Sequence, residues 1–207
     1  MTNVRELFPT KIPDRRRLKV AFVGSHGVGK TTLCFDLASQ LKRLDIGVDL
    51  VKEVARRCPL PINEETTPDA QAWILHTQIA EEMEAAATYE VVVCDRSVLD
   101  NYAYLVARVG QRPELDPLVR SWIRSYDFLF KVPVLHAPSF DGTRAVSRAF
   151  QTEIDATIDQ LIEAFEVHVI PLDPSDRDGW IPTVMGALEL PLKQPQIDLF
   201  GASAVGG

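Results

Sequence analysis

The fold is decided by residues 20–32, which read Val20-Ala21-Phe22-Val23-Gly24-Ser25-His26-Gly27-Val28-Gly29-Lys30-Thr31-Thr32. An apolar run is followed here by the pattern G-x-x-x-x-G-K-[ST]. Phosphate oxygens need many donors at close range, and glycines let successive backbone N–H groups turn inward without an intruding side chain. Lys30 adds a charge for the outer phosphates, Thr31 is placed to ligate Mg²⁺, and the helix that follows directs its positive N-terminus at the anion. Residues 24–32 therefore predict a site for a nucleoside triphosphate.

Apolar runs alternate with helical patterns outward from this stretch. Strands are expected at 18–23, 48–51, 91–95, 128–132 and 167–171, and helices at 31–44, 69–88, 98–109, 114–125, 148–166 and 175–188. Residues 91–94 are continuously apolar, as a strand buried on both faces of a sheet should be. The alternation predicts a three-layer α/β fold, in which helices cover both faces of a five-stranded parallel sheet and ligands bind at the carboxyl ends of the strands.

The bulk composition limits the class of the protein. The 207 residues are 46% hydrophobic, enough for one domain, which we place at 18–188 between a leader at 1–17 and a flexible tail at 189–207. A net charge of -7 argues against direct binding to nucleic acid or an anionic membrane. The three cysteines are widely spaced and fit neither a disulfide framework nor a zinc site. No apolar run approaches the ~20 residues of a membrane span and no signal peptide is visible, so a cytoplasmic location is expected.

Asp95 ends the apolar strand expected at 91–95. Its carboxylate should then reach the Mg²⁺ shell from across the phosphate loop. The alternative is an aspartate that only caps the following helix. The phosphate loop upstream favours the metal role, so Thr31 and Asp95 are the predicted metal residues.

Two short motifs follow the second and third expected strands. They are Glu53-Val54-Ala55-Arg56 and Asp95-Arg96-Ser97. With the phosphate loop, they make the chain resemble the deoxynucleoside and thymidylate kinase group of P-loop small-molecule kinases, and in particular the AAA-type branch of nicotinamide riboside kinase-like ATP/GTP-binding proteins. The resemblance spans residues 18–188. It implies a phosphotransferase that uses ATP and Mg²⁺ and acts on a nucleoside, a nucleotide or a nicotinamide riboside-like small molecule.

The resemblance also implies roles for residues beside the phosphate loop. Glu53 matches the acid that approaches the acceptor hydroxyl, where it orients or deprotonates that hydroxyl or holds a metal-bound water. Arg96 matches an arginine that contacts the acceptor or the transferred phosphoryl group, and Arg56 is a candidate acceptor contact. Local ion pairs are the alternative for these charges. Glu53 and Arg96 join Lys30 and Asp95 as predicted catalytic residues.

The segment 132–147 fits a short lid, because it combines proline, glycine and arginine residues between a strand and a helix. Phosphoryl transfer concentrates charge on oxygens between donor and acceptor, and an arginine brought in by closure stabilises that charge. Arg144 and Arg148 are the lid candidates. Solvated helix-face charges are the alternative for either one.

The long helix expected at 69–88 lies where the family presents side chains to the acceptor. Positions 71, 75, 78 and 82 share one face, and 73, 76 and 80 share another. Gln78 is a candidate for reading a base edge and Trp73 for stacking on a ring, although core packing is the commoner fate of a helical tryptophan. No guanine-reading Asn-Lys-x-Asp follows the last expected strand, which favours ATP over GTP as the donor.

The tail carries Gln196-Ile197-Asp198-Leu199-Phe200, which resembles the Q-L-[S/D]-L-F peptides by which bacterial repair and replication proteins dock on the sliding clamp. Ile197 departs from that pattern. A glutamine amide suits a polar pocket, and Leu199 and Phe200 suit an apolar one. The alternative is that these apolar residues fold back on the domain. Two further functions stay open: a regulatory ATP/GTP-binding protein without kinase activity, and a nucleic-acid or nucleotide kinase tethered to the replication clamp.

Overall fold

The computed structural model describes residues 17–135 and 147–190. Its elements in chain order are β1 (Leu18–Val23), α1 (Lys30–Arg43), β2 (Val48–Val51), the 3-10 helices η2 (Val54–Arg57) and η3 (Asn63–Glu65), α2 (Pro68–Thr88), β3 (Val91–Asp95), α3 (Val98–Val109), α4 (Asp116–Ile123), β4 (Phe128–Lys131), α5 (Arg148–Ala164), β5 (Ile170–Pro171) and α6 (Trp180–Ala187). Nearly all of the predicted leader and tail, and most of the predicted lid, lie outside the described residues. None of the described helices has the length and apolar character needed to cross a membrane.

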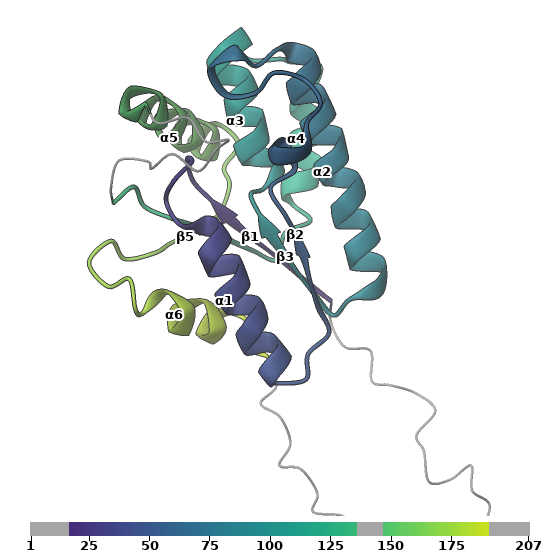
Figure 1. Ribbon diagram of the computed structural model, residues 1–207, viewed down its shortest axis with the longest axis vertical. Helices are drawn as coiled ribbons and strands as arrows, with labels where there is room; N and C mark the ends of the chain where they lie inside the picture. The colour runs from purple at the N-terminus through teal and green to yellow at the C-terminus, as the bar shows by residue number, and fades with distance from the viewer. Residues whose placement is uncertain (1–16, 136–146, 191–207) are drawn as a thin grey trace, which may run out of the picture.

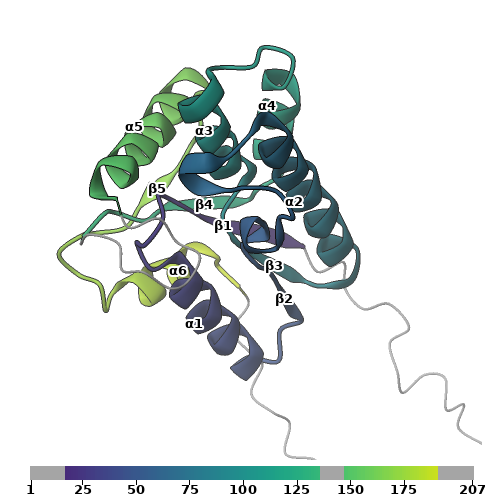
Figure 2. The same ribbon diagram turned by 45° about the horizontal axis from the view of Figure 1, so that its top comes forward.

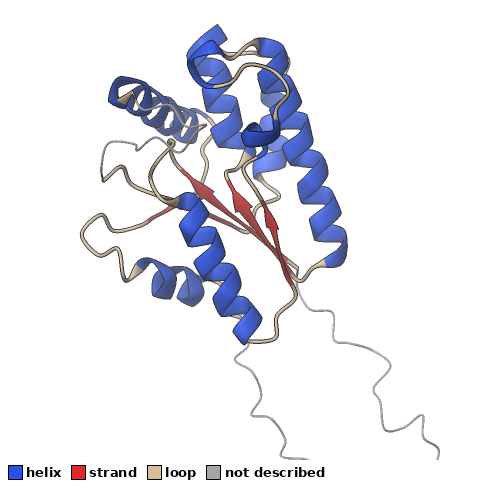
Figure 3. Cartoon of the chain, viewed as in Figure 1, coloured by secondary structure: helices blue, strands red, loops and turns tan. Residues whose placement is uncertain are grey.

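A five-stranded parallel sheet in the order β2-β3-β1-β4-β5 forms the middle layer (Figure 1). In the centre, β1 pairs with β3 on one side, where Phe22 lies opposite Asp95, and with β4 on the other, where Phe22 lies opposite Phe130. Because the strands are parallel, their carboxyl ends meet at one edge, and α1 begins at that edge (Figure 3). The predicted α/β fold is confirmed.

Helices cover both faces of the sheet (Figure 2). α1 and α6 pack on one face, against Val20 and Phe22 of β1, whereas α2, α3, α4 and α5 pack on the other face, against Ala21 and Val23. Successive side chains of a strand point to opposite faces, so each central strand contributes to two cores. This is why residues 91–94 of β3 are apolar without interruption.

The last strand and helix are shorter than predicted. β5 comprises only Ile170–Pro171, and α6 begins at Trp180 rather than near residue 175. Between them, Asp173 Oδ1 accepts a hydrogen bond from Ser175 N at 2.8 Å, and Asp176 Oδ1 accepts one from Gly179 N at 3.0 Å. Aspartates that bond the backbone locally compete with helix formation, so the helix begins only after these turns.

Unusual backbone conformations gather at the carboxyl edge of the sheet. Gly24 and Gly29 have φ values of 153° and 98°, and Arg96, which has a side chain, has a φ of 100°. A Cβ on Gly24 would lie 2.8 Å from the carbonyl oxygen of Val132, so a larger residue requires a backbone shift. Positive φ strains a non-glycine residue. The backbone at Arg96 is therefore imposed by the surrounding contacts, and these belong to the site described next.

Candidate active site

The phosphate loop joins β1 to α1 and borders a cavity of about 150 Å³. Residues 26–32 line it, together with Glu53, Ala55, Arg56, Ile62, Asn63, Asp95 and Arg96. Gly24 N donates to Asp100 Oδ1 at 2.9 Å, which fixes the start of the loop to α3. Gly29 is the left-handed N-cap of α1, and no described side chain caps this helix. The first N–H groups of α1 are therefore available to an anion, in the arrangement that the motif predicts.

Lys30 is buried at the centre of the loop. Its Nζ donates to the carbonyl oxygens of Gly24 at 2.5 Å and Ser25 at 2.6 Å. Burial, together with the nearby Arg96 guanidinium, lowers the pKa of Lys30 from 10.5 to about 8. Within residues 17–135 and 147–190, no carboxylate forms an ion pair with Lys30. A buried cation that no described carboxylate contacts directly is suited to bind the outer phosphates of a nucleotide.

Thr31 and Asp95 form a pair of oxygen ligands at the mouth of the loop. Thr31 Oγ1 donates to Asp95 Oδ2 at 2.6 Å. Burial raises the pKa of Asp95, although the Thr31 hydroxyl and Lys30 act in the opposite direction. A hydroxyl beside a carboxylate is the donor chemistry that Mg²⁺ prefers. Among the described residues, no group of three or more His, Cys, Asp or Glu side chains could hold a metal ion, so the remaining ligands of an ion here would be phosphate or water oxygens.

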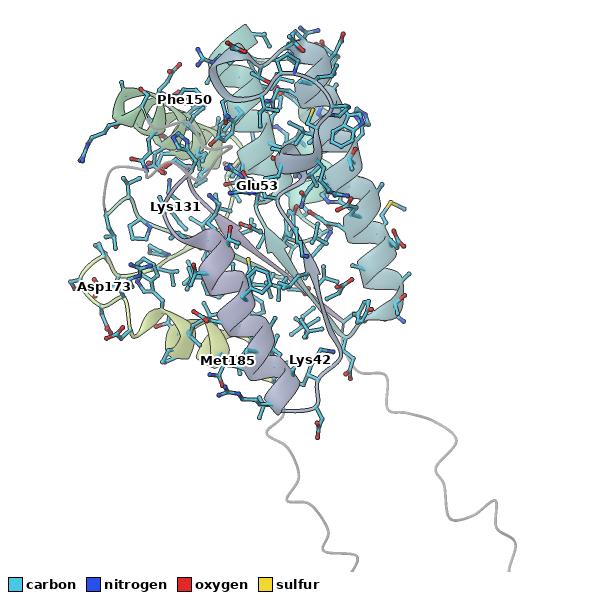
Figure 4. All side chains as sticks on the ribbon, viewed as in Figure 1. Lys42, Glu53, Lys131, Phe150, Asp173 and Met185 are labelled. Carbon is cyan, nitrogen blue, oxygen red and sulfur yellow. The ribbon has the colours of Figure 1, made fainter. Side chains whose placement is uncertain are left out.

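Glu53 lies at the carboxyl edge of the sheet, beyond the end of β2 (Figure 4). Arg96 Nη2 lies 2.7 Å from Glu53 Oε1, and Arg56 Nε donates to Oε2 at 2.8 Å. The Glu53–Arg96 pair is buried, with side-chain exposures of 15% and 7%, and so differs from a surface ion pair. Burial opposes ionisation of Glu53, but the charges of Arg96, Lys30 and Arg56 outweigh it and lower its pKa from 4.5 to about 2. Glu53 is therefore a firmly ionised carboxylate beside the phosphate loop.

A second, smaller pocket continues from this cavity toward α2 and α3. The two pockets share Glu53 and Arg96, and the second is also lined by Gln71, Ile74, Asn101 and Tyr104. Tyr104 OH accepts a hydrogen bond from Arg96 Nη2 at 3.4 Å. Arg96 Nη1 and Asn101 Nδ2 are buried without a hydrogen-bond partner among the described residues. Because unsatisfied buried donors are costly, they favour a ligand that brings acceptor atoms to this pocket.

The first turn of α5 contacts the phosphate loop. Gln151 Nε2 donates to the carbonyl oxygen of His26 at 2.8 Å, and the rings of Phe150 and His26 lie 5.5 Å apart. Arg148 is the first residue of α5 and is exposed, one turn from these contacts. Arg144 lies outside the described residues. The lid role of both arginines stays a prediction.

A family assignment comes from comparison with known proteins. The model of an AAA domain family, AAA_28, matches residues 19–178, which is most of the chain and includes every element from β1 to β5. The chain belongs to this AAA domain family. It is therefore a P-loop NTPase, and its phosphate loop is a nucleotide-binding site. No curated protein matches the sequence.

Two solved structures share the fold of this AAA domain. Deoxyadenosine kinase from M. mycoides with bound dATP is 16% identical, with a TM-score of 0.59 over 83% of this chain and 99% of the other. Thymidylate kinase from Ehrlichia chaffeensis is 18% identical, with a TM-score of 0.61 over 84% of this chain and 100% of the other. These similarities establish a nucleoside and nucleotide kinase-like fold.

The AAA domain places two of the predicted acceptor contacts away from its pockets. Gln78 is fully buried, and its Nε2 donates to Glu82 Oε1 at 2.8 Å and to the carbonyl oxygen of Arg96 at 3.3 Å. Gln78 therefore braces the strained backbone of Arg96, and the predicted base-reading contact is not supported. Trp73 is half-buried on the neighbouring helix face and lines neither pocket. Arg56, by contrast, does line the larger pocket.

The sequence reasoning missed Gln71, Asn101 and Tyr104 as site residues. All three side chains are buried and line the smaller pocket of the AAA domain. A signal for two of them was present, because Asn101 and Tyr104 lie three positions apart in α3, whose residues 98–105 are all buried. Polar side chains on the buried face of an amphipathic helix require partners, and a ligand is one way to provide them.

Proposed function

We propose that this AAA domain is a small-molecule kinase, which uses Mg²⁺ to transfer the γ-phosphoryl group of ATP to a nucleoside, a nucleotide or a nicotinamide riboside-like acceptor. The observation that carries the proposal is the buried Glu53–Arg96 pair, which lies where the phosphate cavity meets the smaller pocket. Hydrolysis or nucleotide sensing alone does not require a second pocket on the far side of such a pair. An acceptor bound there would have its hydroxyl or phosphate close to the outer phosphate of ATP.

Thr31 and Asp95 are the residues that would hold Mg²⁺ together with the nucleotide phosphates. A bound Mg²⁺ neutralises charge on the phosphate oxygens as the transition state forms. Lys30 adds a second positive charge from within the loop. Arg96 adds a third from the acceptor side, where it is buried and oriented by Glu53 before the reaction begins. Charges fixed in advance stabilise a transition state more than charges that must reorganise.

The low pKa of Glu53 defines its proposed role. A carboxylate with a pKa of about 2 is a weak base at neutral pH, and it would accept a proton only late in the transfer. In a loose transition state, the bond from phosphorus to the leaving oxygen is largely broken before the acceptor oxygen attacks, so early removal of the hydroxyl proton is not needed. We therefore assign Glu53 to orienting the acceptor hydroxyl by accepting its hydrogen bond and to holding Arg96.

The smaller pocket sets a condition on how the acceptor enters. Its volume is about 20 Å³, which is enough for about one water molecule and too small for a nucleoside. Ile62 and Asn63 line both pockets and belong to the segment between β2 and α2, which has little regular structure beyond two 3-10 turns. Movement of this segment away from Gln71 and Tyr104 would open the pocket. Binding of the acceptor would thus be coupled to a shift of residues 59–66.

The proposal is tested by measuring ADP production from Mg-ATP against a panel of nucleosides, nucleoside monophosphates, nicotinamide riboside and single-stranded DNA. Products are identified by mass, and a Lys30→Ala preparation controls for contaminating kinases. We expect one acceptor class to gain a single phosphoryl group. If ATP binds but no acceptor stimulates its turnover, the kinase proposal is wrong, and a nucleotide-dependent regulator is the better description. A GTP arm tests the preference for ATP.

A second proposal concerns the tail, which lies outside the described residues. We propose that residues 196–200 dock on a bacterial sliding clamp, because the glutamine, leucine and phenylalanine follow the spacing of clamp-binding peptides. The full chain should bind a purified clamp, and the double substitution Leu199→Ala with Phe200→Ala should abolish binding without changing ATP affinity. Equal binding by this variant would exclude the tail as the docking segment.

A further inference from the structure

The loop at residues 173–179, between β5 and α6, brings a guanidinium to the phosphate loop. Figure 4 shows Asp173 on this loop, on the face of the sheet that α1 and α6 cover. Arg177 Nη2 lies 3.4 Å from the position that a Cβ on Gly29 would occupy. Gly29 is the N-cap of α1 and lines the phosphate cavity. The loop thus reaches the phosphate loop at the N-cap of α1.

The 173–179 loop is exposed but held in a defined shape by three anchors. Trp180, only 2% exposed, donates from Nε1 to the carbonyl oxygen of Asp173 at 2.6 Å. Ser175 donates to Asp173 Oδ1 through both its backbone N at 2.8 Å and its hydroxyl at 2.6 Å. Asp176 Oδ1 accepts from Gly179 N at 3.0 Å. A loop with its ends and its turns fixed loses little further entropy when a ligand binds to it.

Among the residues that the structure describes, no carboxylate pairs with Arg177. Oδ1 of Asp173 accepts from Ser175 and Oδ1 of Asp176 accepts from the backbone of Gly179, and neither carboxylate forms an ion pair with Arg177. Its described interaction is with the ring of Trp180, whose centroid lies 5.9 Å from the guanidinium carbon. Acidic neighbours would normally pair with an arginine on a short loop. Here the guanidinium turns toward the phosphate loop, which already gathers donors for an anion.

We propose that Arg177 binds the phosphates of the donor nucleotide and clamps them against Gly29. The proposal goes beyond the kinase activity and rests only on nucleotide binding by the phosphate loop. Lys30 contacts the phosphates from inside the loop, and Arg177 closes over them from outside. A planar guanidinium forms two parallel hydrogen bonds to phosphate oxygens, which an ammonium group does not. The α6 segment thereby becomes part of the nucleotide site as well as of the core.

The test compares the Kd values of Mg-ATP, Mg-ADP and adenosine for the full chain and its Arg177→Ala variant by calorimetry. We expect the Kd of ATP and ADP to rise by about tenfold or more, as loss of a charged hydrogen bond predicts, while the Kd of adenosine is unchanged. Arg177→Lys should restore part of the affinity for ATP. Arg43→Ala, at the other end of α1, removes the same charge from an exposed position and should change nothing.

Two results would overturn the proposal. Unchanged Kd values for ATP and ADP in Arg177→Ala would show that the guanidinium does not contact the nucleotide. An equal loss for adenosine would show that it stacks on the base rather than binding phosphate. Thermal unfolding of each variant verifies that the fold is intact, which is expected because Arg177 is exposed. Failure of the kinase assay would leave this test unaffected, since it measures binding alone.

Discussion

The phosphate loop and the smaller pocket, which we propose as the donor side and the acceptor side of the site, are built in different ways. On the donor side, one continuous segment supplies the glycines, Lys30 and Thr31, and the helix N-terminus follows immediately. On the acceptor side, the pocket draws Glu53 from the end of β2, Arg96 from the end of β3, Gln71 from α2, and Asn101 and Tyr104 from α3. Phosphate is the same in every nucleotide and is recognised largely by backbone donors, so a local motif is sufficient. An acceptor has its own shape, and several elements must converge on it.

The difference predicts how each side responds to change. Substitutions on the donor side should reduce nucleotide affinity and turnover whatever the acceptor is. Substitutions in the acceptor pocket should leave nucleotide binding intact and alter the acceptor KM or the rate of transfer.

Lys30→Ala should have the largest effect. It removes the buried cation that faces the phosphates, and loss of a preorganised charge of this kind reduces kcat by about 10²- to 10³-fold. The measurement is ADP production with a saturating acceptor, and Lys42→Ala, an exposed lysine on the same helix, is the control. Near-normal turnover in Lys30→Ala would mean that the loop does not bind the outer phosphates as proposed.

Glu53→Gln should reduce kcat by about 10²-fold while the Kd of ATP changes little, because the carboxylate lies on the acceptor side of the cavity. The amide also leaves Arg96 buried without its counter-charge, so a lower unfolding temperature is expected. Single-turnover transfer and ATP calorimetry measure the two effects separately, with Glu84→Gln on the exposed face of α2 as the control. A loss of ATP binding as large as the loss of transfer would place Glu53 on the donor side.

Gln71→Ala and Asn101→Ala should raise the acceptor KM by about tenfold each, with kcat less affected, since each removes one polar contact from the pocket. The exposed His76 on α2 provides the control substitution His76→Ala. By the same reasoning, Trp73→Ala should leave the acceptor KM unchanged, because Trp73 does not line the pocket. A rise in KM in Trp73→Ala alone would show that the acceptor binds along the other face of α2.

The pH dependence of nucleotide binding should show the smallest effect. The pKa of Lys30 is lowered to about 8, so the free protein loses this charge as the pH rises above 8. Phosphate favours the charged amine, so binding above pH 8 should take up a proton and the affinity should fall by less than tenfold per pH unit. Calorimetry in buffers of different ionisation enthalpy detects the proton. Lys30→Arg, which stays charged, should show no uptake; persistent uptake would identify another group.

The lowered pKa of Lys30 also makes the stability of the fold depend on pH. The folded-state pKa lies below the ordinary value of 10.5, so between pH 8 and 10.5 the unfolded chain binds more protons than the folded one. The contribution of Lys30 to the free energy of unfolding therefore increases as the pH rises through this window. The pKa of Glu53 is lowered from 4.5 to about 2. Its stabilising contribution to the free energy of unfolding is therefore present above pH 4.5 and is lost as the pH falls toward 2.

Features that depend on neighbours along the chain could be predicted from the amino-acid pattern alone. The apolar runs of β1 and β3, the phosphate loop and the placement of Asp95 at the end of β3 all follow from local patterns, and the strand alternation was enough to predict the parallel sheet. The shorter α6 escaped prediction because its start is set by side-chain turns at Asp173 and Asp176. Helical periodicity does not reveal such turns in advance.

Which side chains line the pocket, and which charges surround each of them, depends on the tertiary structure. The sequence pattern indicated that positions 71, 75, 78 and 82 share one face of α2. The fold places Gln71 at the smaller pocket, whereas Gln78 donates a hydrogen bond to the backbone carbonyl of Arg96. It also converted Glu53 from a candidate base into a carboxylate with a pKa of about 2, because three cations from separate segments meet around it. The helical period fixes the direction in which each side chain points around the helix axis. The burial and the pKa of a side chain depend instead on which elements pack around it. The phosphate site is therefore local chemistry, and the acceptor site is a product of packing.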